Sequence, residues 1–161
     1  MRKTYKKTIG NEVLIYVFEK NENRRLRNVY SLWMSCVGMG LNNLDESKEI
    51  IEKFLNRNPD TCYLAIEADE VIGLIMVGND GRRGYIYHTA VHPNYRKQGI
   101  GKALVEITLD SLLELGINKV ALVVFERNNA GNEFWEKMGF TSRNDLIYRN
   151  KALVKIERID T

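Results

Sequence analysis

The chain has 161 residues, which is enough for one domain with its own hydrophobic core and too few for two ordinary domains. Its 44% of hydrophobic and 28% of charged residues, with only two prolines, are typical of a globular protein and exclude a disordered or collagen-like chain. The 24 Lys and Arg against 21 Asp and Glu leave a net charge of +3, too little by itself to hold the protein on DNA or a membrane. We therefore expect a single domain over residues 1–161 with no nucleic-acid or membrane partner, while an anionic small ligand stays compatible with the charge.

The ends and the cysteines give no sign of export. The first seven residues are basic, but polar residues follow where a secretion signal would have an unbroken apolar stretch. No apolar run approaches the roughly 18 residues that a membrane-spanning helix needs. Cys36 and Cys62 are too few for a disulfide framework or a cysteine-rich zinc site, and we expect both to be reduced packing residues. A cytoplasmic protein without a metal is the expectation.

Apolar patterning in the first part of the chain predicts a strand followed by two helices. The run 13–18 is rich in β-branched and aromatic residues, as in a strand that opens a sheet. Apolar residues then recur at helical spacing over 21–37. A second amphipathic stripe, 50–55, follows the N-cap candidates Asp45 and Ser47 and predicts another helix.

A hairpin, a third strand and a crossover connection come next. The runs 62–66 and 71–77 predict the hairpin, and 85–91, ended by Pro93, predicts the third strand of an antiparallel meander. The continuous apolar run 120–125 is typical of a central strand buried on both faces, and strand–helix–strand order predicts that it runs parallel to the third strand. The remaining predicted elements are a helix through 105–112 that ends at Gly116, a helix at 130–138, and a terminal pair of β-like runs at 140–141 and 147–156. Together they predict an α/β (α+β) fold, a mixed and mostly antiparallel sheet flanked by about four helices.

One segment, residues 91–102, combines glycines with positive charge between a strand and a helix. Gly99 and Gly101 let the backbone approach a ligand closely. Unpaired N–H groups at a helix start bind phosphate groups, and Arg96 with two lysines adds cations beside them. The spacing fits neither a P-loop nor a dinucleotide-binding motif. A tight turn with solvated cations is the alternative interpretation.

Two patterns in the second half of the chain carry more information. The first is Arg96-x-x-Gly99-x-Gly101, preceded by Val91-x-Pro93-x-Tyr95 at a strand end. The second is Asn128-x-x-Gly131-x-x-Phe134-Trp135-x-Lys137-x-Gly139-Phe140. In this order they resemble the acyl-CoA pyrophosphate loop and the following helix motif of the GNAT superfamily of N-acetyltransferases. The predicted element order is similar from the first strand to the last, so the resemblance covers essentially the whole chain.

The resemblance implies acetyl-CoA as co-substrate, no metal, and a cleft where two parallel strands splay apart. The backbone N–H groups of the loop would hold the pyrophosphate, namely those of Lys97, Gln98, Gly99, Ile100, Gly101 and Lys102. Ala90 and Val91 would hydrogen-bond the pantetheine arm as if it were a short extra strand. Asn128 would meet the arm from the other side, with Gly131 and Trp135 lining the cleft.

The chain departs from the family at the expected general acid. Trp135 stands where many relatives have a tyrosine that protonates the leaving thiolate, and an indole N–H does not give up a proton at useful pH. Tyr148 and Tyr87 are then candidates for the acid, with solvent as the alternative. His88 is the candidate base because imidazole titrates near neutral pH. Strand alternation puts His88 on the same face as Ile86 unless a bulge intervenes, and the pattern does not assign that face to the cleft.

The implied reaction is direct attack of a neutral amine on the thioester in a ternary complex, without a covalent enzyme intermediate. The acceptor would bind between the two N-terminal helices and the terminal hairpin, and both a small-molecule amine and a peptide amine fit the sequence. A non-catalytic acyl-CoA-binding or regulatory module is the alternative, favoured by Trp135. A nucleic-acid-binding protein is a third interpretation that rests only on the charge. Dimers are common in the family, so a homodimer is a further expectation.

Overall fold

The computed structural model describes residues 8–9, 13–19 and 23–159, which form four α-helices and a six-stranded sheet. In chain order the elements are β1 (Thr8–Ile9), β2 (Val13–Val17), α1 (Asn23–Ser35), α2 (Lys48–Arg57), β3 (Tyr63–Glu67), β4 (Glu70–Asn79), β5 (Gly84–Val91), the 3-10 turn η1 (Pro93–Tyr95), α3 (Ile100–Glu114), β6 (Val120–Ala121) and α4 (Asn129–Lys137). The strands lie in the order β1-β2-β3-β4-β5-β6, and each pair of neighbours is antiparallel except β5 and β6, which are parallel. The predicted fold class is thereby confirmed.

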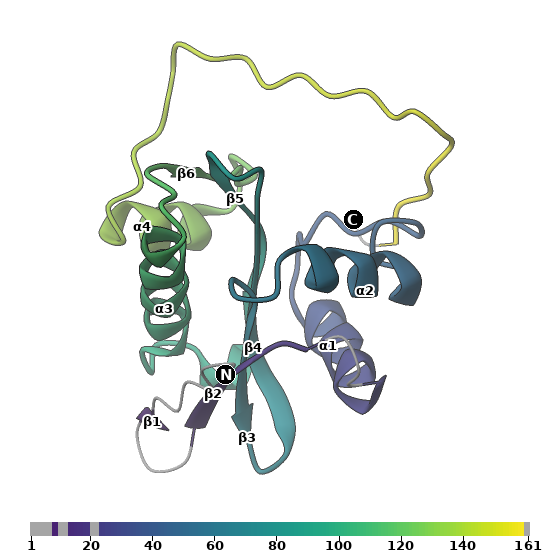
Figure 1. The fold of residues 1–161 in the computed structure, drawn as a ribbon, viewed down its shortest axis with the longest axis vertical. Coiled ribbons are helices and arrows are strands. Elements are labelled where there is room, and N and C mark those ends of the chain that lie inside the picture. The colour runs from purple at the N-terminus through teal and green to yellow at the C-terminus, as the bar shows by residue number, and fades with distance from the viewer. Residues whose placement is uncertain (1–7, 10–12, 20–22, 160–161) are drawn as a thin grey trace.

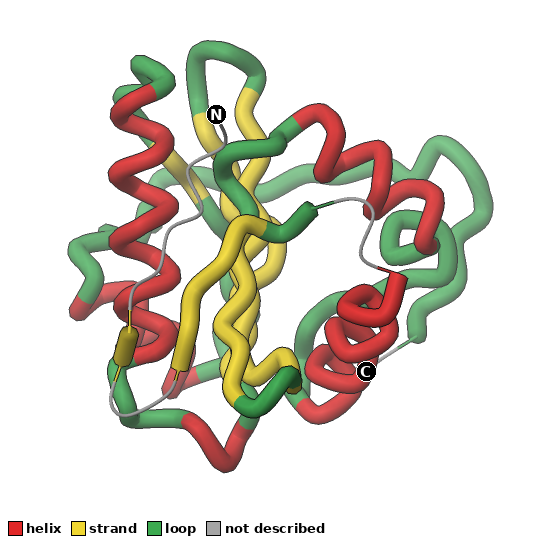
Figure 2. Tube along the Cα trace, turned by 60° about the horizontal axis from the view of Figure 1, so that its bottom comes forward, coloured by secondary structure: helices red, strands yellow, loops and turns green. Residues whose placement is uncertain are grey.

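The sheet is the middle of three layers. Helices α1 and α2 lie on one face, whereas α3 and α4 lie on the other, as the ribbon and tube views show (Figure 1, Figure 2). Side chains alternate along the buried strands, so Leu64 and Leu74 join an apolar cluster with α1 and α2. Tyr63 and Ile75 join a second cluster with α3. The two clusters form the core, one on each face of the sheet.

A glycine in β4 lets the start of α3 come close to the sheet. An added Cβ at Gly73 would lie 3.0 Å from Cγ2 of Ile100 and 3.2 Å from Cδ1 of Leu104. Both contacts are closer than a side chain tolerates without displacing its neighbour. The absence of a side chain at Gly73 therefore allows the first turn of α3 to pack close to the sheet.

A bulge in β5 changes which side chains face α1 and α2. His88 lies opposite Met76, but Ile86 lies opposite Val77, so Tyr87 is an extra residue on this strand. Met76 belongs to the core cluster on the α1 side, while Val77 and Ile86 belong to the cluster on the α3 side. His88 and Ile86 thus point to opposite faces, because the bulge that the sequence left open is present and interrupts the simple alternation.

Three other expectations differ from the structure at the two edges of the sheet. The sheet begins with β1 and not with the strand at Val13, because Thr8–Ile9 pairs with that strand. The predicted strand 120–125 is ordered as a strand only at Val120–Ala121, and its residues are half-buried or exposed instead of buried on both faces. The reason is that β6 is an edge strand, since no described residue pairs with its outer side.

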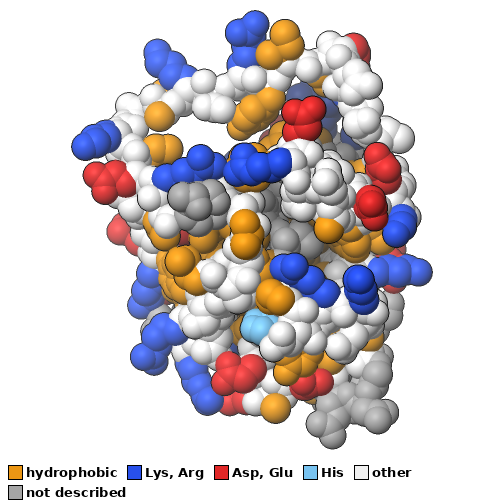
Figure 3. Space-filling view, turned by 180° about the vertical axis from the view of Figure 1, so that it is seen from behind, with side chains coloured by type: hydrophobic (Ala, Val, Ile, Leu, Met, Phe, Trp, Pro, Cys, Tyr) orange, Lys and Arg blue, Asp and Glu red, His pale blue; other side chains and the backbone are white. Residues whose placement is uncertain are grey.

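The predicted terminal strand pair, 140–141 with 147–156, does not form. Residues 141–156 arch away from the body as an extended loop (Figure 1), and open space lies beneath the arch in the space-filling view (Figure 3). The N–H of Phe140 bonds to the carbonyl of Trp135 at one end, and at the other the N–H of Ile159 bonds to the carbonyl of Leu41. A strand forms only where it can pair with the edge of another strand, and residues 141–156 pair with none of the described strands. The large apolar side chains of this arch are therefore exposed, namely Leu146, Ile147, Tyr148, Leu153 and Val154.

Candidate active site

The junction between β5 and α3 has the backbone geometry of an anion-binding loop. Gly99 is the N-cap of α3 with a left-handed φ of 83°, and no side chain caps this helix end. Lys97 is also left-handed, with φ of 61°, which is uncommon for a residue with a side chain. Left-handed residues in alternation with right-handed ones turn successive N–H groups toward one side, and the first N–H groups of α3 lack intrahelical acceptors. The loop Lys97–Lys102 therefore presents several donors at the positive end of a helix dipole.

Arg96 does not point toward these donors but back to the strand. Its Nε donates to the carbonyl oxygen of Val91 at 3.0 Å, and one terminal nitrogen lies 3.6 Å from Sγ of Cys36 at the end of α1. Nζ of Lys102 lies 3.7 Å from Oε1 of Glu106 in the next turn of α3, and this ion pair is exposed. Arg96 thus links the loop to β5 and to the end of α1. Its role here is structural, although the sequence grouped it with Lys97 and Lys102 as a cation for the ligand.

The open edge of β5 carries main-chain groups that no strand uses. The pairing of β5 with β6 stops at Tyr85, and in the described residues nothing pairs with this edge further on. The N–H of His92 donates to the carbonyl of Ile72 in β4, and antiparallel pairing alternates, so the N–H and carbonyl of Ala90 also point to β4. The main-chain groups of Thr89 and Val91 point to the open edge instead, and the carbonyl of Val91 is already bonded by Arg96.

The second motif lies against the first. Phe134 of α4 packs over the start of α3, where an added Cβ at Gly101 would be 3.4 Å from its ring. Asn128 is the N-cap of α4, since its Oδ1 accepts the N–H of Gly131 at 3.0 Å. An added Cβ at Gly131 would overlap Nδ2 of Asn128, so the glycine leaves room for this cap. The two motifs that the sequence linked are therefore adjacent in space.

Trp135 is a packing residue in this arrangement. Its ring lies edge-on between those of Phe134 and Phe140, with centroids 5.0 Å from each. It belongs to the partly buried side chains around the core cluster on the α3 side. The aromatic stack fixes α4 against the turn that follows it.

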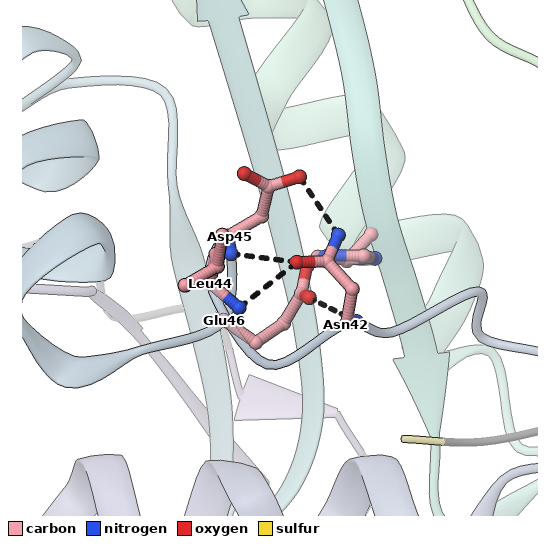
Figure 4. A network of polar contacts seen from close by, with 5 residues as sticks. Asn42, Leu44, Asp45 and Glu46 are labelled. Carbon is pink, nitrogen blue, oxygen red and sulfur yellow. Dashed lines mark hydrogen bonds and ion pairs between the residues drawn. The ribbon is translucent and has the colours of Figure 1, made fainter. Parts of the chain in front are cut away.

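His88 faces α1 and the loop before α2, where it meets a buried carboxylate. Its Nε2 lies 3.0 Å from Oε1 of Glu46, and its ring packs on Trp33 with centroids 5.2 Å apart. Glu46 accepts the backbone N–H of Asn42 through its other oxygen, within a loop network shown in Figure 4. Burial raises the pKa of Tyr30 on α1, and the charge of Glu46 raises it further, so this phenol stays neutral beside the pair.

A group of aromatic residues lines the same face further along β5. Tyr87 packs edge-on against Phe54 of α2 and lies 4.8 Å from the ring of Tyr85. Burial raises the pKa of Tyr85, and the hydroxyls of Tyr148 and Tyr87 raise it further. Tyr87 and Tyr148 are 57% and 67% exposed, so neither is a core residue.

The structure brings most of the predicted site residues to one region and adds some that the sequence pattern did not reveal. The start of α3 at Gly101, Val91 at the end of β5 and Phe134 of α4 lie together, with His88 on the opposite face of β5 from Val91. Glu46 was missed because it stands beside Asp45 and Ser47, where the pattern indicates only a helix start. Thr89 was missed because its main-chain direction depends on strand pairing.

Comparison with known proteins agrees with this geometry. The chain matches the model of the acetyltransferase (GNAT) family over residues 13–140. It is 35% identical over 127 residues to an acetyltransferase of Sodalis glossinidius, covering 79% of this chain and 88% of that protein. It is 34% identical over 146 residues to an acetyltransferase of Photorhabdus laumondii, covering 89% of this chain and 98% of that protein.

Solved structures show the same architecture. The NatC complex bound to Gag peptide and CoA contains a chain with a TM-score of 0.70 and 26% identity, over 81% of this chain and 86% of that one. The PaiA N-acetyltransferase of Thermoplasma acidophilum in complex with coenzyme A has the same fold, with a TM-score of 0.72 at 18% identity over 83% of this chain and 92% of that one. Within the described residues no helix is long and apolar enough to cross a membrane. By the family match and by these relatives, the chain belongs to the GNAT family of acetyltransferases.

Proposed function

We propose that this acetyltransferase uses acetyl-CoA and transfers the acetyl group directly to an amine in a ternary complex. The observation that carries the proposal is the junction of β5 and α3, where left-handed Lys97 and Gly99 turn backbone donors outward at an uncapped helix start. Such donors suit the pyrophosphate of coenzyme A. The bound coenzyme A in the NatC and PaiA structures supports the same assignment.

The open edge of β5 suits the pantetheine arm of the same ligand. An amide-bearing arm can pair with unpaired strand groups as an extra strand does. The available groups are the main-chain atoms of Thr89 and the N–H of Val91, since those of Ala90 point to β4. In this proposal the oxyanion of the tetrahedral intermediate takes its hydrogen bond from one of these N–H groups.

The acceptor amine has to lose a proton before it attacks. An alkylamine is mostly protonated near neutral pH, so a base is required. We propose His88 as this base, because it lies on the α1 side of β5 and is held by Glu46. For the proton that the leaving thiolate takes up, Tyr148 is the proposed donor, since its side chain is largely exposed and its hydroxyl acts electrostatically on that of Tyr85 in β5.

The acceptor would approach from the α1 and α2 side. His88 and the aromatic group of Phe54, Tyr85 and Tyr87 lie on this face of β5. The faces of aromatic rings attract cations, which suits an acceptor that arrives as an ammonium ion. Both a small-molecule amine and a peptide amine fit this description.

A non-catalytic acyl-CoA-binding module is the second candidate, and one observation favours it. Trp135 is stacked between Phe134 and Phe140, so the position where many relatives carry a tyrosine acid offers only packing.

Two measurements separate the candidates. Calorimetric titration with acetyl-CoA tests binding, and release of free CoA thiol in the presence of a panel of amines and peptides tests transfer. An enzyme binds acetyl-CoA and releases CoA with at least one acceptor. Tight binding with no release across a broad panel supports the binding module, and absence of binding overturns both.

A further inference from the structure

The loop between α1 and α2 places a buried carboxylate against the proposed base. Glu46 is only 5% exposed, and its Oε1 lies 3.0 Å from Nε2 of His88. Its Oε2 accepts the backbone N–H of Asn42 at 2.6 Å, as Figure 4 shows for the loop around Glu46. A buried carboxylate is costly unless it is hydrogen-bonded, and here both oxygens have a donor. Glu46 is therefore held in one orientation.

The loop that carries Glu46 is itself folded around one side chain. Oδ1 of Asn42 accepts the N–H groups of Leu44 and Asp45 at 3.0 and 2.8 Å, and its Nδ2 donates to the Asp45 carboxylate. The N–H of Asn43 bonds to the carbonyl of Glu157 at the end of the arch. These bonds hold the loop in place, so the position of Glu46 is set before any ligand binds.

This contact defines the protonation pattern of the imidazole. A carboxylate only accepts hydrogen bonds, so Nε2 of neutral His88 carries the hydrogen and Nδ1 holds the lone pair. In the described part of the chain, Nδ1 of His88 is buried with no hydrogen-bond partner, and so is Nε1 of Trp33 on the neighbouring ring. Unsatisfied buried polar atoms are costly and usually bind an ordered water. A single water that donates to Nδ1 of His88 and accepts from Nε1 of Trp33 would satisfy both atoms.

We propose that Glu46 is the positioning residue for His88: it fixes the Nε2–H tautomer, so that Nδ1 takes the acceptor's proton through one water that also binds Trp33. The proposal rests on the proposed acetyl transfer to an amine.

The ammonium ion of the acceptor gives a proton to the water, which passes one to Nδ1. The nitrogen lone pair then forms the C–N bond while the carbonyl electrons move onto oxygen, and collapse of this tetrahedral intermediate breaks the C–S bond, so that the thiolate leaves with its electron pair. The new amide nitrogen loses a second proton and the thiolate takes one up, while the imidazolium, stabilised by Glu46, returns its proton to solvent.

The tautomer can be measured without any activity. The chain has two histidines, His88 and His92, so the ¹⁵N spectrum of the imidazoles is simple, and His92→Asn assigns it. We expect His88 in the neutral wild-type protein to be wholly in the Nε2–H form. In Glu46→Leu, which removes the acceptor, the two tautomers should mix. In Glu46→Gln one amide oxygen replaces the two that accept from Nε2–H of His88 and from the N–H of Asn42, so the tautomer mixture should lie between those of the wild type and Glu46→Leu.

Kinetics with an acceptor from the amine panel complete the test. We expect kcat to fall about 100-fold in Glu46→Leu, at the low end of general-base effects, and about tenfold in Glu46→Gln, which keeps one hydrogen-bond acceptor but loses the charge and the second acceptor. The KM for acetyl-CoA should stay within twofold, and Glu49→Gln, an exposed carboxylate in the first turn of α2, is the matched control. In a His88→Gln background, Glu46→Leu should cost nothing more, because the two act as one unit.

The results that overturn the proposal are distinct from those that overturn the proposed function. An Nδ1–H or mixed tautomer of His88 in the wild-type protein would exclude the positioning role whatever the activity. An unchanged kcat in Glu46→Leu, or an equal loss in Glu49→Gln, would do the same. Absence of acetyl-CoA binding in calorimetry, by contrast, would count against the proposed function and leave the tautomer result intact.

Discussion

Arg96 reaches back from the loop after β5 and donates through Nε to the carbonyl oxygen of Val91, 3.0 Å away. The same side chain touches Cys36, so one guanidinium joins the loop, the strand end and the end of α1. A guanidinium supplies several donors in a fixed plane, which a lysine does not. The loop that presents backbone donors at the start of α3 is therefore tied to the sheet by a side chain.

Loss of the Arg96 contacts with Val91 and Cys36 should weaken acetyl-CoA binding more than loss of a positive charge elsewhere on the surface does. We expect Arg96→Met to raise the Kd for acetyl-CoA about tenfold, because the loop must then be ordered by the ligand itself. Arg82→Met in the β4–β5 turn removes the same charge away from the loop, and should change the Kd less than twofold. Calorimetric titration of both variants checks this. Equal, small changes in the two would mean that Arg96 acts only through net charge.

The left-handed conformation at Gly99 gives a second test of the loop. A valine at φ of 83° is strained, but its Cβ would meet no atom within 4 Å, so the fold should tolerate the change. We expect Gly99→Val to abolish measurable binding of acetyl-CoA by displacing the backbone donors. Gly81 in the β4–β5 turn has φ of 82° and the same open surroundings, which makes Gly81→Val a matched control.

Both valine variants should lose about 1–2 kcal/mol in the free energy of unfolding, since the backbone strain is the same. Only the Gly99 variant should lose binding. If Gly99→Val binds acetyl-CoA as the control does, the assignment of the phosphate loop is incorrect.

The elements that could be predicted from the sequence are those that local signals define. Ser47 caps α2 as its residue type suggests, and Gly116 ends α3 with a left-handed φ of 76°. The loop before α3 was recognisable because its glycines and cations lie within a few residues of one another. Helix boundaries and turns depend on neighbours in sequence, and these predictions are confirmed.

The features that could not be predicted depend on partners far away in the chain. The strand pair expected at 140–141 and 147–156 had good β-forming residues, but a strand needs an edge to pair with, and propensity does not supply one. The direction of His88 could not be assigned from the sequence because the bulge at Tyr87 arises from the pairing of β5 with β4. The contact of His88 with Glu46 joins residues 42 apart in sequence. No local pattern could indicate it.

The β3–β4 turn offers a test of local strain. Ala68 and Asp69 have φ of 47° and 68°, the conformation of a tight hairpin turn that favours Asn followed by Gly. We expect Ala68→Asn with Asp69→Gly to raise the free energy of unfolding by about 1–2 kcal/mol, measured by urea denaturation. The double change also removes the exposed ion pair of Asp69 with Arg24, so Arg24→Ala is the control and should change stability by less than about 0.5 kcal/mol. A loss of stability in the double variant would contradict this account of the turn.

The proposed acid can be tested with two tyrosines. Tyr148→Phe should lower kcat about tenfold, a modest effect because a thiolate is already a fair leaving group near neutral pH. Tyr87→Phe keeps the ring contact with Phe54 and should leave kcat within twofold. The rates are compared at several pH values with a fixed acceptor. Unchanged rates in both variants would leave solvent as the source of the proton.

Cys62 provides a test of the core itself. This thiol is fully buried, and burial raises its pKa to about 12 from an ordinary value of 9.0, although hydrogen bonds to Val77 and Thr61 act in the opposite direction. At pH 8 the thiolate fraction is then on the order of one in ten thousand, about a thousandfold below that of an ordinary thiol, and only the thiolate is alkylated rapidly. In a Cys36→Ser background, Cys62 should resist iodoacetamide in the folded protein and react within minutes in urea, as mass spectrometry can follow. Rapid alkylation of the folded protein at pH 8 would show that the strand around Cys62 opens far more often than its packing implies.

The raised pKa of Cys62 also makes the free energy of unfolding depend on pH. Because the folded state favours the neutral thiol, the contribution of Cys62 to this free energy is complete below about pH 9 and is lost as the pH rises toward 12.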